Sequence, residues 1–138
     1  MPMRRFAQAA IVRLPISGGD WLDVKAELTA GEQREMFTAM VRTTASGEPV
    51  FQDGRPLRDP TLFARSMIAA YVLDWSFVLE GRPIEVSVQT IDGLLPLTFA
   101  EVADAVNAHD DRVRAAQEAE KNAPDGASSS RPISPSVA

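Results

Sequence analysis

The feature that most constrains the fold is residues 21–28, in which apolar and charged side chains alternate. A period of two with one charged side is typical of a strand that buries a single face. Residues 10–16 alternate more weakly, and the turn residues Ser17-Gly18-Gly19-Asp20 lie between the two segments. We therefore predict an antiparallel hairpin whose apolar face is covered by another layer. Trp21 falls on the charged side, where it could cover the sheet edge or contact a partner.

Three helices are predicted from their start signals. Thr29 and Glu32 form a capping box, and the helix that they begin should end near residues 42–44. Asp59-Pro60 begins a second helix whose body, residues 62–73, is apolar around most of its circumference, as in a central helix packed on several sides. A further capping box at residues 98–101 predicts a last helix that runs to about residue 121.

A second alternating segment completes the predicted sheet. Ile84, Val86 and Val88 alternate with polar residues, so we predict that residues 83–89 join residues 10–28 in the sheet. The expected fold class is α+β, with a small antiparallel sheet packed on about three helices. Residues 1–122 should form one domain, and residues 123–138, rich in Ser and Pro, should be a disordered tail.

The apolar stripe of the last helix is incomplete. After Val106 the same face meets polar residues at 107–111, and only Val113 and several alanines follow. We therefore predict that the first half of this helix packs on the core and that the second half projects into solvent, where it either remains solvated or binds a partner. The candidate partner-contact residues are Val106, Val113 and Ala116, together with Trp21.

The sequence contains no assembled reactive group. It has no Cys, which removes disulfides and thiolate chemistry, and a single histidine, His109, is too few for a histidine metal site. His109 is expected on an exposed polar face of the last helix. Adjacent helix positions point about 100° apart, so neither Asp110 nor Asp111 is automatically aimed at the imidazole as an acid-base partner. Asp74 could be a catalytic acid, but a hydrogen bond to a neighbouring backbone or Trp N–H is favoured. We predict a non-enzymatic protein with no catalytic residue, cofactor or metal.

Charge and hydropathy narrow the class of partner. The net charge is −5 and only two lysines occur, so nucleic acid is a poor candidate. No apolar run approaches the length of about 20 residues that a membrane-spanning helix needs, and no secretory signal is expected at the N-terminus. The absence of Cys fits a reducing cytoplasm. Binding to other proteins is the remaining interpretation.

Three blocks of the sequence, in this order, resemble small tail assembly chaperones of phages with long, non-contractile tails, particularly phages of actinobacterial hosts. The blocks are residues 20–33, residues 74–77 followed by the turn at residues 81–83, and residues 91–94 leading through Thr98 to residues 101–109. The resemblance covers residues 10–122. The sequence departs from the family pattern at Leu95-Pro96-Leu97, where a more polar, acidic turn is expected.

The resemblance implies a protein that binds the tape measure protein, keeps it soluble and brings tail tube subunits to it. It also implies action in the host cytoplasm, absence from the mature virion, and in many members a longer frameshifted form. Self-association is compatible with this function. The alternatives are a structural virion protein of the tail or the head-tail junction, a small enzyme and an unrelated bacterial adaptor domain.

Overall fold

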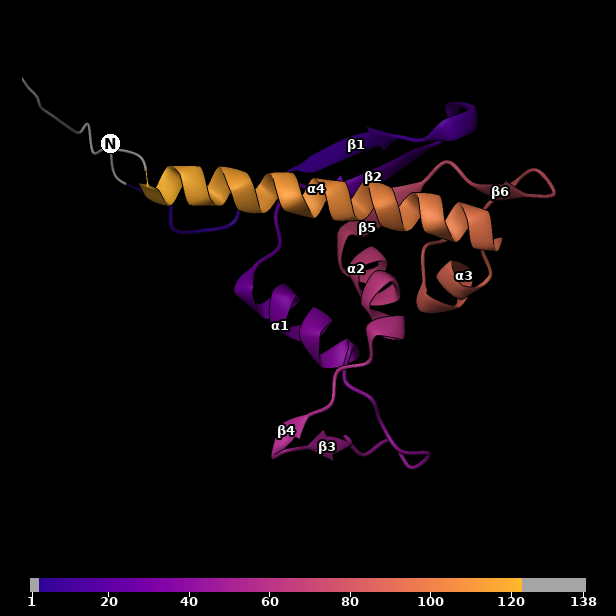
Figure 1. Cartoon of the computed structure of the whole chain (residues 1–138). Coiled ribbons are helices and arrows are strands. Elements are labelled where there is room, and N and C mark those ends of the chain that lie inside the picture. The colour runs from indigo at the N-terminus through magenta and orange to yellow at the C-terminus, as the bar shows by residue number, and fades with distance from the viewer. Residues whose placement is uncertain (1–2, 123–138) are drawn as a thin grey trace, which may run out of the picture.

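The computed structural model describes residues 3–122, and the predicted tail at residues 123–138 lies outside the described residues. Short strands and helices alternate along the chain (Figure 1). The elements are β1 (Ile11–Pro15), the 3₁₀ turn η1 (Ser17–Gly19), β2 (Trp21–Lys25), α1 (Ala30–Ala39), β3 (Phe51–Gln52), β4 (Arg55–Pro56), the 3₁₀ turn η2 (Pro60–Leu62), α2 (Phe63–Tyr71), β5 (Val72–Trp75), β6 (Val78–Leu79), β7 (Arg82–Pro83), α3 (Val88–Asp92) and α4 (Pro96–Asn122).

The predicted hairpin of β1 and β2 is confirmed. The two strands are antiparallel, with Val12 opposite Val24 and Leu14 opposite Leu22. Leu22 and Val24 are fully buried, so the alternating pattern of residues 21–28 identified the inner face correctly. Both glycines of the turn have positive φ, 70° at Gly18 and 78° at Gly19, a conformation that side chains with a Cβ rarely adopt.

The third strand of the sheet is not the one that the sequence pattern predicted. The sheet order is β1-β2-β5, because the helix expected to continue to residue 73 ends at Tyr71 and residues 72–75 pair with β2. The prediction that residues 83–89 join this sheet is wrong. Ser87 instead caps α3 by accepting a hydrogen bond from the Thr90 N–H, which commits residues 88–92 to a helix.

Helix α2 lies at the centre of the molecule, as its apolar composition predicted. It packs against α1, α3 and α4, and Met67, Ile68 and Tyr71 are buried. Helix α1 begins with the predicted capping box, in which the Thr29 side chain accepts from the Glu32 N–H and the Glu32 side chain accepts from the Thr29 N–H. One cluster of buried apolar side chains joins the sheet to all four helices, in agreement with the predicted α+β fold.

Helix α4 begins at Pro96, before the predicted capping box. The carboxylate of Glu101 does not cap α4. It accepts hydrogen bonds from the backbone N–H and the hydroxyl of Ser17, both at 2.8 Å, and so ties the hairpin turn to the helix. Within residues 3–122, no helix is both long enough and apolar enough to cross a membrane.

Candidate protein-interaction surfaces

The middle of α4 is held against the core by buried polar side chains. The hydroxyl of Tyr71 donates to the Asp110 carboxylate at 2.6 Å, and Nε of Arg114 donates to the same carboxylate at 2.9 Å. Nε2 of His109 lies 2.9 Å from the Lys25 carbonyl oxygen, and its ring meets the edge of the Tyr71 ring at 5.3 Å. Burial, followed by the hydrogen bond to Asp110, raises the pKa of Tyr71, so the phenol keeps its proton. The expectation that His109 is exposed is wrong, and α4 stays packed through Asp110. From residue 111 onward its side chains are exposed, as predicted, apart from the half-buried Val113.

The far end of α4 is tied to the N-terminal segment. The guanidinium of Arg4 bonds the carboxylates of Glu27 and Glu120, at 2.7 Å and 3.0 Å through Nη2. Glu27 also accepts from the backbone N–H of Gln8 at 2.7 Å and from the amide of Gln117 at 3.2 Å. The hydrogen bond from Arg4 is the main reason why the pKa of Glu27 falls to about 2. Polar contacts with the N-terminal segment and Glu27 therefore hold this end of α4, whose side chains otherwise stay exposed.

The predicted contact residues do not form one surface. Val106 is fully buried and belongs to the core, so its assignment as a partner contact is wrong. Val113 is half-buried, and Ala116 is exposed on α4. Trp21 lies on the face of β2 opposite the buried Leu22 and Val24, where the guanidinium carbon of Arg13 stacks 3.7 Å from its ring centroid.

No catalytic arrangement was found around Asp74. Its carboxylate accepts from the backbone N–H of Trp75 at 2.9 Å, which is the structural role that the sequence favoured. The indole N–H of Trp75 donates to the Ile84 carbonyl oxygen at 2.7 Å. Across the described part of the chain, no three His, Asp or Glu side chains come together as ligands for a metal ion.

The first exposed surface is apolar and belongs to the segment from β6 to the start of α4. Figure 1 shows α3, the start of α4 and the β6–β7 hairpin at the same end of the molecule. Within this segment, five aliphatic side chains keep large exposed fractions: Val78 58%, Leu79 66%, Val88 45%, Leu95 73% and Leu97 87%. We name this set the apolar end. Exposed aliphatic groups at one end of a domain make that end a candidate protein-binding surface.

The sequence patterns did not predict the apolar end, although the sequence contains one signal for it. Leu95 and Leu97 flank Pro96, the first residue of α4, so both leucines lie at the junction between two helices. This is the position at which the sequence departs from the polar turn of the family that it resembles. Two exposed leucines at this junction make it a candidate contact surface.

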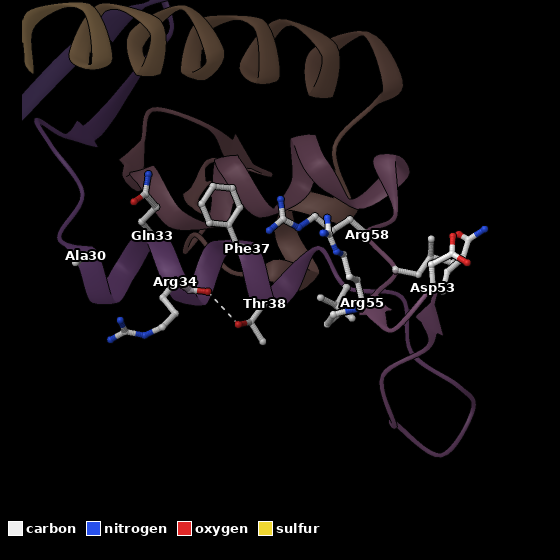
Figure 2. A pocket seen from close by; sticks show the side chains of 12 residues that line it. Ala30, Gln33, Arg34, Phe37, Thr38, Asp53, Arg55 and Arg58 are labelled. Carbon is white, nitrogen blue, oxygen red and sulfur yellow. Dashed lines mark hydrogen bonds between the residues drawn. The ribbon is translucent and has the colours of Figure 1, made fainter. Parts of the chain in front are cut away.

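The second exposed surface is a groove between α1 and the β3–β4 hairpin (Figure 2). The groove has a volume of about 1170 Å³. Phe37, Val41 and Leu57 give it apolar walls, and the Arg58 guanidinium carbon lies 5.0 Å from the centroid of the Phe37 ring.

Positively charged side chains line this groove at two places. Figure 2 shows Arg34 directed toward the N-terminal end of α1, away from Arg55 and Arg58. Arg34, Arg55 and Arg58 line it, and none of them forms an ion pair with another residue in the described range 3–122. The acidic side chain in the lining is Asp53, at the turn of the hairpin. A protein with a net charge of −5 thus carries one groove of the opposite sign, which we name the arginine groove.

Comparison with known proteins gives no further assignment. No family model matches the chain, and no match was found among curated proteins or among solved structures. The functional conclusion therefore depends on the surfaces described above and on the sequence blocks that resemble tail assembly chaperones.

Proposed function

We propose that this protein is a phage tail assembly chaperone that binds the tape measure protein and keeps it soluble while the tail is built. The resemblance of residues 20–33, 74–83 and 91–109 to that family motivates the proposal. The observation that carries it is the apolar end, where five aliphatic side chains remain exposed on a folded domain. Such a surface can cover apolar stripes of a long amphipathic client that would otherwise aggregate.

The energetics favour weak contacts repeated many times. Burial of a partly exposed aliphatic side chain contributes roughly 1–2 kcal/mol, and each association event costs several kcal/mol of lost translational and rotational freedom. One copy would therefore bind weakly, and the coverage of many sites along one client would be set by the concentration of free copies. The net charge of −5 on each copy would keep the covered client in solution.

The proposed function also includes delivery of tail tube subunits to the covered tape measure protein, in the host cytoplasm, and release before the virion is complete. In this scheme the apolar end holds the client, and the remaining surfaces are available for other partners. Val113 and Ala116 lie far along α4 from the apolar end and are not needed for this contact. Trp21 lies nearer to it, because its backbone is hydrogen-bonded to Ser76, two residues before Val78.

Co-expression of the tape measure protein with the chaperone tests the proposal. With the wild-type chain the client should remain in the soluble fraction. With the double variant Leu95→Ser/Leu97→Ser the soluble client should fall by about tenfold or more, because two of the most exposed apolar groups are lost. Client in the supernatant and in the pellet is measured by quantitative gel analysis.

The matched control is the double variant Phe6→Ser/Ile11→Ser. These residues are also strongly exposed, at 86% and 64%, but they lie near the start of the chain. This variant should keep the client soluble. Full solubility with Leu95→Ser/Leu97→Ser, in a chaperone that is still folded, would refute the assignment of the apolar end as the client surface.

A further inference from the structure

We propose that the arginine groove binds the outer face of α4 from a second copy of this chain, so that copies associate head to tail. The contact is separate from the apolar end and does not depend on a client. Among residues 3–122, the groove supplies arginines without ion-pair partners on apolar walls, and α4 supplies a row of acids without ion-pair partners.

The acidic row is defined by helix geometry. Asp104, Asp111 and Glu118 are spaced seven residues apart and exposed, and none has an ion-pair partner in residues 3–122. At 100° per residue they lie about 140° to 180° from the centre of the buried stripe of Val102 and Val106. The acidic row therefore faces away from the domain that carries it.

The residues between these acids permit close approach. Ala108 and Ala115 are exposed beside the acids and leave room on one side of the row. Asn107 and Arg114 lie on the other side, where the Arg114 guanidinium is bound to Asp110. A helix face with small residues can approach the apolar wall formed by Phe37, Val41 and Leu57, while its carboxylates reach the guanidinium groups around that wall. Arginine suits this contact, because its planar fork pairs with a carboxylate through two hydrogen bonds.

The dimensions of the two surfaces are compatible. The α1 wall of the groove extends from Ala30 to Thr38, about 12 Å at 1.5 Å per residue. Consecutive acids of the row are separated by about 10 Å along the helix axis. The groove can therefore hold two acids of the row at once, Asp104 with Asp111 or Asp111 with Glu118.

The placement of the two surfaces determines the type of assembly. Figure 1 shows α4 on one side of the molecule and the β3–β4 hairpin on the other, with α2 between them. A contact between different surfaces of two copies is heterologous and leaves a free groove and a free helix at the ends. Growth should therefore continue beyond the dimer.

Sedimentation velocity of the purified full chain tests the inference without any client. At 0.1 M salt the weight-average mass should rise with concentration above the monomer value of 15.0 kDa and should pass the dimer value. At 1 M salt, where the screening length falls from about 10 Å to about 3 Å, the mass should return toward the monomer. The reversals Arg34→Glu/Arg55→Glu and Asp104→Lys/Asp111→Lys should each weaken association by about a hundredfold.

Charge restoration separates a specific contact from a general change in charge. A chain that carries both reversals should associate again, because the groove is then acidic and the helix basic. The matched control Arg5→Glu/Arg82→Glu reverses two exposed arginines that also have no ion pair within the described residues, and it should associate like the wild type.

Three results would overturn the inference. They are a wild-type mass that stays at 15.0 kDa at all concentrations, a mass that levels off at the dimer, and association that is unchanged by Arg34→Glu/Arg55→Glu. If the groove reversal abolished retention on heparin and left association intact, the groove would bind an external polyanion instead. Failure here leaves client binding by the apolar end untouched, because the two experiments use different residues and different readouts.

Discussion

Val106→Asp is expected to unfold the protein or to reduce its free energy of unfolding by about 5 kcal/mol or more. Val106 is fully buried in the cluster that joins α4 to α2 and the sheet, so the new carboxylate would have neither water nor a cation beside it. Burial of an unpaired charge costs several kcal/mol, and a domain of this size has only about 5–15 kcal/mol of stability in total. Circular dichroism with urea denaturation measures the change.

Ala116→Gln is the matched control on the same helix. Ala116 is exposed, and Gln has nearly the same helix propensity as other good helix formers, so the free energy of unfolding should change by less than about 0.5 kcal/mol. A Val106→Asp protein as stable as the wild type would mean that α4 does not pack on the core at this position.

Asp110→Ala should lower the free energy of unfolding by about 3 kcal/mol. The substitution leaves the buried hydroxyl of Tyr71 without its acceptor and releases Arg114, whose side chain can turn into water. Most of the loss therefore comes from the unsatisfied phenol, because a buried polar group without a partner loses its solvation on folding and gains nothing in return. Denaturant titration gives the value.

A double-mutant cycle with Tyr71→Phe isolates this contact. Tyr71→Phe alone should cost about 1 kcal/mol, because Asp110 keeps its bonds from Arg114. In the Asp110→Ala background the same change should cost nothing or restore up to about 1 kcal/mol, since it removes the unsatisfied hydroxyl, and the two losses should fail to add by about 1–2 kcal/mol. Strict additivity would show that the hydrogen bond contributes no coupling free energy.

The parts of the fold that local sequence patterns specify were predicted well. The hairpin from Ile11 to Lys25 and the start of α1 at Thr29 depend on contacts within a few residues, namely alternation, a glycine turn and a capping box. The central position of α2 also followed from its composition, because a helix that is apolar on most sides must be covered on most sides.

The third strand could not be predicted in the same way. Residues 72–75 and residues 83–89 both contain β-branched residues, and the choice between them depends on which segment reaches β2 in the folded chain. The cap at Ser87 was the local signal that favoured a helix after it. The burial of His109 depends on the carbonyl group of Lys25, 84 residues away in the sequence, which no pattern within α4 reveals.

The interaction surfaces also depend on the folded arrangement more than on local sequence patterns. The incomplete stripe of α4 directed attention to Val106, which the structure places in the core. The exposure of Leu95 and Leu97 depends on how α3 and α4 meet, and the arginine groove brings Arg34 beside residues that lie about 20 positions later. Side chains that gather only after folding leave no compact motif in the sequence.

Amide hydrogen exchange of this protein, measured with and without the tape measure protein, tests the proposed client surface. The measurement is made at 1 M salt, where charge-dependent association between copies is screened. Contact through the apolar end predicts slower exchange at residues 78–97 in the complex and unchanged exchange at residues 107–122. Slower exchange confined to residues 107–122, with no change at residues 78–97, would refute the apolar end as the client surface.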